Sequence, residues 1–157
     1  MKIKKEADSF DLAHRKALRL LQVRNRSCKE IEDRLRAGGY REGVTGAILE
    51  RLKRSGLLDD RRFALERARA MGKRKGWGPR KLRWDLSRYG LADELIDQAV
   101  EQAYGKLSRT SIMKRAVRKR FGEDALLTDA DRKLRGRAHR FLLGRGFEPD
   151  EVHTLFS

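Results

Sequence analysis

The residues best suited to chemistry in this chain are cations, and their densest group surrounds a tryptophan. Residues 73–81 read Lys-Arg-Lys-Gly-Trp-Gly-Pro-Arg-Lys, which places flexible positive charges and an aromatic ring beside the start of a predicted helix. Lysine and arginine bind phosphates or carboxylates, helix N-terminal amides favour anions, and an exposed tryptophan can stack on a base. The pattern predicts an anion-binding surface made of Lys73, Arg74, Lys75, Trp77, Arg80, Lys81, Arg83 and Arg88.

The same stretch also allows a purely structural interpretation. Trp77 could pack at a hinge, and the cations could form an ordinary solvated helix face. A second tryptophan, Trp84, lies two residues from both Leu82 and Leu86 and therefore off the main apolar stripe. We expect Trp84 to be a partly buried packing residue rather than a contact for a ligand.

A second basic cluster follows at residues 114–120, Lys-Arg-Ala-Val-Arg-Lys-Arg. Positions four apart share one face of a helix, so the cations can form stripes while the alanine and valine turn inward. A run of this kind is often only a solvated face. With an equally basic neighbour, it is predicted to extend the binding surface through Lys114, Arg115, Arg118 and Lys119.

Catalysis finds little support in the sequence. His14, His139 and His153 are far apart, and none has a cysteine or carboxylate at metal-ligand spacing. Cys28 sits just inside a predicted helix start, which could lower the pKa of its thiol, but without a nearby histidine we expect packing instead. Asp59-Asp60 is best explained by helix capping. We therefore predict a protein that is not an enzyme and has no metal or cofactor.

The composition restricts the partners. The 157 residues include 39 Lys and Arg against 23 Asp and Glu, for a formal net charge of +16. Such a charge favours nucleic acid, an acidic protein or an anionic membrane surface. No apolar run approaches a membrane span, and residues 1–6 lack the apolar core of a signal peptide. A single cysteine fits a reducing compartment. We expect a cytoplasmic protein without a membrane partner.

Helix-capping residues and turn residues predict helices throughout the chain, and no stretch shows the period-two alternation of a strand. Ser27-Cys-Lys-Glu30 is a capping box, and Pro79 and Pro149 suit the first position of a helix. Glycines 39, 90 and 146 suit C-terminal caps. The predicted helices span residues 9–23, 28–37, 42–55, 60–74, 79–88, 93–105, 110–121, 129–144 and 149–156.

One phrase recurs three times: a leucine, a glycine four residues later, and then an aromatic residue or leucine. The copies run from Leu35 to Tyr40, Leu86 to Leu91 and Leu142 to Phe147. Recurrence at this scale predicts an array of similar helical units. We expect an all-α protein of three tandem three-helix repeats resembling helix-turn-helix units, near residues 9–58, 59–105 and 106–157, with the central repeat strongly basic.

The sequence also resembles a known family, that of the RecX regulatory proteins. The resemblance lies in Gly56–Ala64, Lys75–Leu82 and Leu86–Leu91, with further support from Leu21–Ile31 and Arg140–Phe147. It covers nearly the whole chain, and it is looser in the third repeat. The matching motif positions, most of which look architectural, are Asp59, Asp60, Phe63, Gly76, Gly78, Leu82, Leu86 and Gly90.

The resemblance implies a specific function. Members of the family are small all-α proteins of three tandem three-helix repeats, curved into an elongated shape. They bind the RecA recombinase, lie in the groove of its filament on DNA, and suppress ATP hydrolysis and strand exchange. They thereby regulate recombination, DNA repair and the SOS response, and some DNA affinity of their own is attributed to them. The family brings no catalytic residues or cofactor. A repeated basic array suits a repeated, anionic groove.

Two other classes compete with this interpretation. Three-helix units can place a helix in the major groove, as a sequence-specific DNA-binding protein does. Against this, the helix predicted at 93–105 is acidic and no dimerisation helix is evident. The second competitor is a general DNA- or RNA-binding protein, for example on the ribosome, without a filament partner. Nothing in the sequence indicates an interface between copies, so we expect a monomer.

Overall fold

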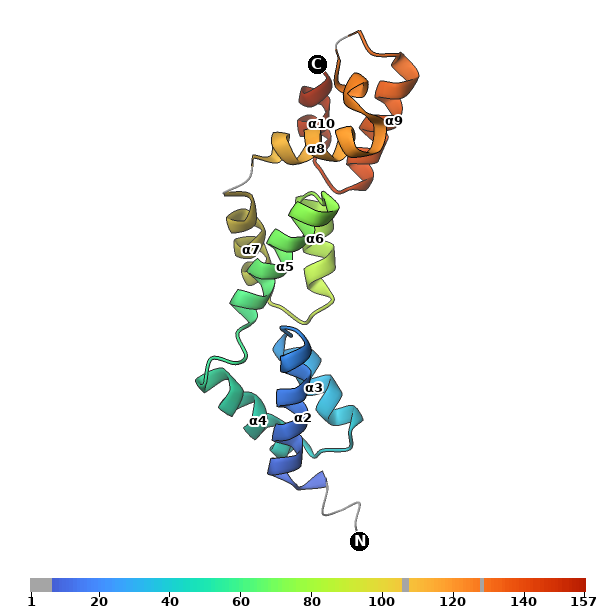
Figure 1. Cartoon of the computed structure of the whole chain (residues 1–157). Helices are drawn as coiled ribbons and strands as arrows, with labels where there is room; N and C mark the ends of the chain where they lie inside the picture. The colour runs from blue at the N-terminus through green and yellow to red at the C-terminus, as the bar shows by residue number, and fades with distance from the viewer. Residues whose placement is uncertain (1–6, 106–107, 128) are drawn as a thin grey trace. The chain divides into compact units, whose positions relative to one another are not determined.

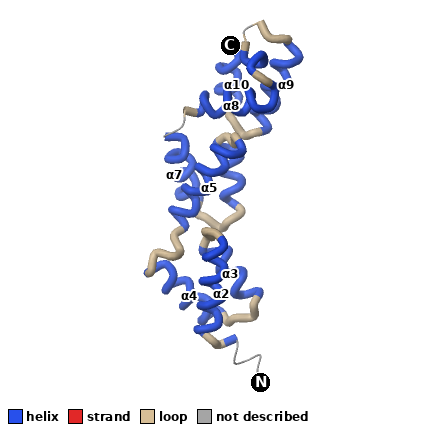
Figure 2. The backbone as a smooth tube through the Cα atoms, viewed as in Figure 1, coloured by secondary structure: helices blue, strands red, loops and turns tan. Residues whose placement is uncertain are grey.

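In the computed structural model, which describes residues 7–105, 108–127 and 129–157, every regular element is a helix (Figures 1 and 2). Two predictions lie outside the described residues. One is that residues 1–6 lack the apolar core of a signal peptide, and the other is that the third repeat starts at residue 106. The elements are α2 (Phe10–Val23), α3 (Cys28–Ala37), α4 (Glu42–Arg54), α5 (Asp60–Lys75), α6 (Pro79–Ser87), α7 (Asp93–Gly105), α8 (Arg109–Phe121), η1 (Glu123–Leu126), α9 (Arg132–Gly144) and α10 (Pro149–Phe156).

The predicted helices are all present, with one boundary clearly misplaced. The helix predicted to start at residue 129 begins at Arg132, because the Asp131 side chain accepts a hydrogen bond from the Leu134 amide and caps the helix there. The short 3-10 helix η1 was not predicted. The division into repeats at 9–58, 59–105 and 106–157 stays a prediction.

The caps explain why these residues start and end helices. Ser27 Oγ accepts from the Glu30 amide at 3.2 Å, and the Glu30 carboxylate accepts from the Ser27 amide at 3.0 Å, which confirms the capping box. Asp59 caps α5 by accepting from the Arg62 amide. The glycines at 39, 90 and 146 have φ of 84°, 67° and 88°, the left-handed conformation predicted for helix ends.

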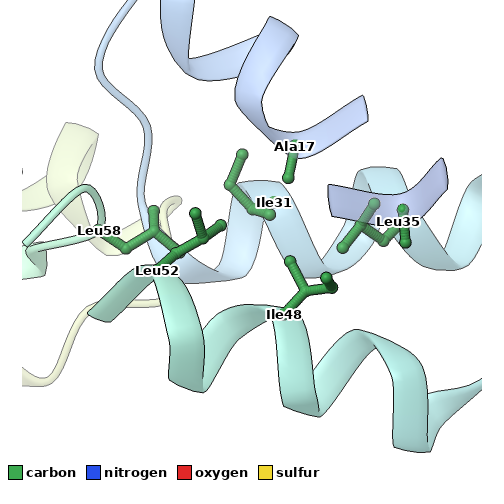
Figure 3. Packing of buried hydrophobic residues seen from close by; sticks show 7 residues of the cluster. Ala17, Ile31, Leu35, Ile48, Leu52 and Leu58 are labelled. Carbon is green, nitrogen blue, oxygen red and sulfur yellow. The ribbon is translucent and has the colours of Figure 1, made fainter. Parts of the chain in front are cut away.

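The chain forms two compact units. Among the described residues, unit 1 comprises residues 7–63 together with Tyr89–Leu91, and it contains α2, α3 and α4 packed on one another. Its core is apolar and nearly inaccessible to solvent (Figure 3): Ala13, Ala17, Ile31, Leu35, Ile48, Leu52 and Leu58. The Phe63 and Tyr89 rings pack with centroids 5.1 Å apart, which ties the residues around Gly90 into this unit.

Unit 2 comprises the described residues of the ranges 64–88 and 92–157. Within it α6 packs on α7, and α8 packs on α9 and α10. Its fully buried side chains include Leu82, Leu86, Val117, Leu142 and Phe147. These buried side chains hold α6, α8 and α9 in place, and these three helices carry the candidate site together with α5.

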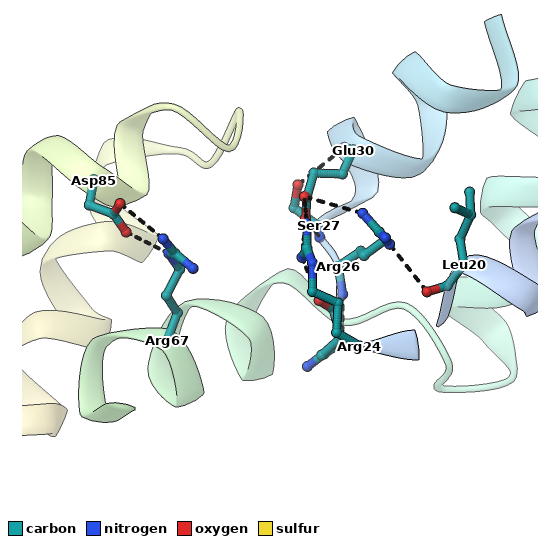
Figure 4. Close-up of polar contacts among 8 residues, drawn as sticks. Leu20, Arg24, Arg26, Ser27, Glu30, Arg67 and Asp85 are labelled. Atoms are coloured by element: carbon teal, nitrogen blue, oxygen red, sulfur yellow. Dashed lines mark hydrogen bonds and ion pairs between the residues drawn. The ribbon is translucent and has the colours of Figure 1, made fainter. Parts of the chain in front are cut away.

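A buried ion pair joins α5 to α6 inside unit 2 (Figure 4). Arg67 Nε and Nη2 donate to the two Asp85 carboxylate oxygens at 2.5 and 3.0 Å, and the Asp85 side chain is only 2% exposed. This bidentate geometry satisfies a carboxylate that burial would otherwise penalise.

Candidate anion-binding site

The two basic clusters predicted from the sequence meet at one cavity in unit 2. The cavity has a volume of about 530 Å³, and it lies where the end of α5 meets α8 and the end of α9. Its described lining includes no carboxylate. Seven of its residues are cations, namely Lys73, Arg74, Lys75, Arg115, Lys119, Arg120 and Arg145. The described lining is completed by Gly76, Ala116 and Phe141.

Two of these arginines are positioned by the carbonyl groups at the end of α5. Arg115 donates to the Lys73 carbonyl oxygen at 3.0 Å, and Arg145 donates to the Lys75 carbonyl oxygen at 2.7 Å. These carbonyls lie at the negative end of the helix dipole, where cations are favoured. A guanidinium has five N–H donors, so each arginine keeps further donors for an anion in the cavity.

The close approach of two backbones holds Arg145 beside the cavity. The Gly78 amide donates to the Arg145 carbonyl at 2.7 Å, and the Arg80 amide donates to the Gly146 carbonyl at 3.0 Å. A Cβ atom on Gly78 or on Gly146 would overlap the opposite backbone. The Gly78 and Arg80 amides already donate to carbonyl oxygens, so these two are not available to an anion, and binding of an anion at the start of α6 stays a prediction.

Trp77 is half-buried next to this backbone contact. Its carbonyl oxygen accepts a hydrogen bond from the Tyr104 hydroxyl, and the Lys81 ammonium lies 5.1 Å from the centre of its ring. Burial raises the pKa of the Tyr104 hydroxyl, which keeps it protonated as a donor. Trp77 thus combines a packing role with one ring face near a cation.

Trp84 differs from the sequence expectation. It is 58% exposed, because Leu82 and Leu86 form the buried stripe of α6 and Trp84 points away from them. The Arg88 guanidinium lies 4.8 Å from the centre of the Trp84 ring. Trp84 also lines a smaller cavity of about 350 Å³ together with Arg80 and Lys81. It is a candidate contact residue rather than a packing residue.

Several other predicted cations have carboxylate partners that offset their charge. Arg83 pairs with Asp97 at 2.7 Å, and Arg118 pairs with Glu123 at 2.6 Å. Arg88 lies 3.5 Å from Asp85. Lys114 is exposed on α8 but lines neither of the two cavities described above. Arg83, Arg88 and Arg118 are therefore compensated cations of the predicted surface, whereas no carboxylate lines the 530 Å³ cavity.

Arg120 and Arg145 line the cavity although neither is among the site residues predicted from the sequence. Arg120 closes the second basic cluster, so its inclusion in the run was the available signal. Arg145 lies 70 residues from Lys75, whose carbonyl it meets. Its position between Gly144 and Gly146 marks a helix end, but only the tertiary structure brings that end to α5.

The motif residues at positions 59–63 and at position 90 are engaged inside unit 1. The Cys28 amide donates to the Asp60 carboxylate at 2.8 Å, so Asp60 satisfies a donor at the start of α3. Burial and the neighbouring Asp60 raise the pKa of the Cys28 thiol to about 11. The thiol pKa is therefore raised although Cys28 lies at the start of α3, where the helix dipole would lower it. This agrees with the expectation that Cys28 is a packing residue. A side chain on Gly90 would overlap Lys29.

Two further findings concern chemistry and membranes. Within the described ranges, no three histidine, cysteine or acidic side chains are grouped so that they could hold a metal ion. No helix in the described part of the chain has both the length and the apolar character needed to cross a bilayer.

Known proteins resemble this chain in sequence and in fold. Models of RecX domains match two stretches of the chain: the first three-helix domain matches residues 13–52, and the second matches residues 59–100. A regulatory protein RecX from Halorhodospira halophila is 37% identical over 139 residues, covering 88% of this chain and 82% of that protein. Another, from Pelodictyon phaeoclathratiforme, is 30% identical over 138 residues with the same coverage of both chains.

Solved structures agree on the fold. The crystal structure of RecX from Lactobacillus salivarius superimposes with a TM-score of 0.79 at 23% identity, covering 93% of both chains. A second RecX crystal structure gives a TM-score of 0.75 and covers 94% of this chain. The predicted all-α fold of tandem three-helix repeats is confirmed by these matches and by the helical structure. The chain belongs to the RecX family of regulatory proteins.

Proposed function

We propose that this protein regulates homologous recombination by binding the RecA–DNA filament and inhibiting the ATPase and strand-exchange activities of RecA. The observation that carries the proposal is the 530 Å³ cavity lined by seven cations, found in a chain of the RecX family. A filament offers repeated phosphates and carboxylates along its axis. The cavity offers guanidinium and ammonium groups whose charge no lining carboxylate offsets.

The arrangement of cations in the cavity supports binding of an anion without a catalytic step. Among the described residues, Lys73, Lys75 and Lys119 have no carboxylate within ion-pair distance, so an incoming anion need not displace an internal partner. Arg115 and Arg145 are held in place by α5 carbonyls, which lowers the entropy lost when they bind. Inhibition is then steric and conformational: the bound protein spans neighbouring protomers, blocks access of duplex DNA, or favours filament disassembly.

A second candidate is a general DNA- or RNA-binding protein with no filament partner. Trp84 favours it, because this exposed ring lies beside Arg80 and Lys81 at the smaller cavity. A base could stack on the ring while the cations contact phosphates. The two candidates differ in whether the protein acts on RecA at amounts that leave most of the DNA unoccupied.

The deciding experiment titrates this protein into the cognate RecA and measures the ATPase rate that depends on single-stranded DNA. Strong inhibition well below one molecule per RecA protomer supports the filament regulator. An effect that begins only when the DNA is saturated contradicts it and supports the general nucleic-acid binder.

A matched pair of variants links the activity to the cavity. The test variant carries Lys73→Glu, Lys75→Glu and Lys119→Glu, which leaves the backbone carbonyls that hold Arg115 and Arg145 in place. The control carries Arg15→Glu, Arg34→Glu and Arg54→Glu, three exposed cations of unit 1 with the same change in net charge. We expect the test variant to inhibit at least about tenfold less well and the control to stay close to the original protein. Equal losses of inhibition in the test and control variants would show that the activity does not depend on this cavity.

A further inference from the structure

A larger basic cavity lies elsewhere in unit 2, between α9 and α10. It has a volume of about 1060 Å³, and none of its lining residues belongs to the surface predicted from the sequence. Its described lining includes two histidines and again no carboxylate. The cations that line it are Arg132, Lys133, Arg135, Arg137 and Arg140.

Aromatic rings lie at the same cavity and hold part of its charge in place. The His139 and Phe156 rings have centroids 6.1 Å apart at an interplanar angle of 45°, and both line the cavity. The Arg135 guanidinium lies 6.0 Å from the centre of the Phe156 ring. Arg137 lies 5.8 Å from the centre of the Phe121 ring on α8. Cation–π contacts of this kind restrict long side chains before a ligand arrives.

A glycine inside a helix also lines the cavity. Gly136 lies in the second turn of α9, where glycine is less favourable than alanine. Packing does not require it, because the nearest atom to an added Cβ would be the flexible end of Arg140, at 3.6 Å. A missing side chain at this position lets a ligand approach the helix backbone.

We propose that this α9–α10 cavity binds a short segment of single-stranded nucleic acid. The arginines contact phosphates, for which the planar guanidinium fork is well suited, and a base lies against the His139 and Phe156 rings beside Gly136. The inference rests on the proposed function in that the regulated filament contains DNA. It assigns the chain's own contact with the DNA strand to a site separate from the 530 Å³ cavity between the end of α5 and α8, called the α5–α8 cavity below.

The lining favours a nucleic acid over an acidic peptide. Peptide helices that dock in grooves need apolar pockets for their anchoring side chains. The described lining provides only Ala130 and Phe156 as apolar residues, and Phe156 is already packed against His139 and Arg135. Four of the five cations are arginines, the side chain best matched to phosphate oxygens.

The first test measures binding of a fluorescent oligothymidylate of about 12 nucleotides to the full chain, without RecA, by fluorescence anisotropy. The test variant carries Arg132→Gln, Lys133→Gln and Arg140→Gln, and the control carries Arg15→Gln, Arg34→Gln and Arg54→Gln. We expect the test variant to bind at least about tenfold more weakly and to show a salt dependence shallower by about 2 in log–log slope. A test variant that binds as the control does would overturn the inference.

The second test needs no change of charge. Gly136→Ala fills the approach to the helix backbone with a methyl group, and Gly46→Ala makes the same helical substitution in α4, where nothing lies within 4 Å. Both variants should keep or raise the thermal midpoint, so loss of folding does not confound them. Weaker binding of the oligothymidylate by Gly136→Ala alone supports the site. Weaker binding of poly-glutamate instead would make it an acidic-peptide site and overturn the inference.

The outcomes separate this inference from the proposed function. Loss of oligothymidylate binding by the α9 variants, in a protein that does not inhibit RecA, keeps this site and removes the filament proposal. Normal oligothymidylate binding by the α9 variants, in a protein that inhibits RecA below stoichiometric amounts, does the reverse.

Discussion

Unit 1 and unit 2 place their positive charge differently. Residues 29–60 carry seven cations and seven carboxylates, and many of them pair: Lys29 with Asp33, Arg36 with Glu32, and Lys53 with Glu50. In unit 2, residues 64–88 carry nine cations and two carboxylates, and the end of α5 contributes three cations to a cavity without a lining carboxylate. The difference teaches that the local balance of charge, more than the total of +16, marks the surface available to an anion.

Two carboxylates of unit 2, one on α6 and one on α7, follow the same logic. Asp85 is buried against Arg67, where it stabilises the packing of α5 on α6, and Asp97 offsets Arg83 at the surface. Neither lines the α5–α8 cavity. These two carboxylates therefore pair inside the unit or at its surface, and the cavity keeps its charge.

The largest expected effect comes from removing the buried carboxylate. Asp85→Ala takes away the acceptor of two hydrogen bonds from Arg67 and leaves a guanidinium that is mostly buried. We expect a loss of about 3 kcal/mol in the free energy of unfolding, measured by urea denaturation. Asp97→Ala removes an exposed partner instead and should change stability by about 0.5 kcal/mol or less. Similar losses in the two variants would show that Asp85 is no more important than a surface charge.

The next effect compares two glycines with the same backbone conformation. Gly146 in unit 2 has φ of 88° and meets the α6 backbone, whereas Gly39 in unit 1 has φ of 84° and nothing within 4 Å of an added Cβ. Gly39→Ala should cost about 1 kcal/mol from backbone strain alone. Gly146→Ala should cost at least about 1 kcal/mol more, because the backbones must separate.

The same substitution tests how Arg145 is held. If the α6 contact positions Arg145 at the cavity, Gly146→Ala should also weaken anion binding, and Gly39→Ala should not. Equal unfolding free energies for the two alanine variants, measured by urea denaturation, would mean that the close approach near Gly146 relaxes without cost.

A smaller effect distinguishes two helix starts. The Ser27 hydroxyl caps α3 and is fully buried, whereas Ser108 at the start of α8 makes no capping hydrogen bond through its side chain. Ser27→Ala should cost about 1 kcal/mol and Ser108→Ala close to nothing, by thermal or urea unfolding. A neutral Ser27→Ala would imply that Glu30 and Asp60 alone satisfy the start of α3.

Local signals predicted the helices well, since a cap or a proline at a helix start depends on neighbouring residues only. Ser27 and Pro79 are such signals and mark helix starts in the structure, and Gly146 follows the end of α9. The η1 turn has no comparable cap, because Gly122 precedes it without a side-chain hydrogen bond, so it was missed.

The site was only partly predictable, because it depends on contacts between residues that are far apart in the sequence. The two basic clusters are visible in the sequence, but their meeting at one cavity depends on how α8 packs on the end of α5. Arg145 and the occupied amides of α6 follow from the contact between Gly78 and Gly146, which are 68 positions apart in the chain. Trp84 was misjudged because its exposure depends on which face of α6 the core covers.

An effect confined to alkaline pH concerns Cys28, and it belongs to unit 1 alone. Burial and Asp60 raise the pKa of the thiol in the folded protein from 9.0 to about 11. Between these values the folded chain holds a proton that the unfolded chain has lost, so the free energy of unfolding should fall as pH rises through this range. Below pH 9 the contribution is fully present, and reaction of the thiol with a disulfide reagent should be slow.

A serine variant separates the contribution of Cys28 from other effects of pH on stability. Cys28→Ser removes the thiol and leaves the surface charge unchanged, so its stability should fall less steeply with pH than that of the original protein. Asp60→Asn removes the nearby negative charge and should lower the pKa of the thiol, which thiol reactivity against pH would report. Unchanged reactivity in Asp60→Asn would mean that burial alone sets this pKa, and that the carboxylate serves only the Cys28 amide at the start of α3.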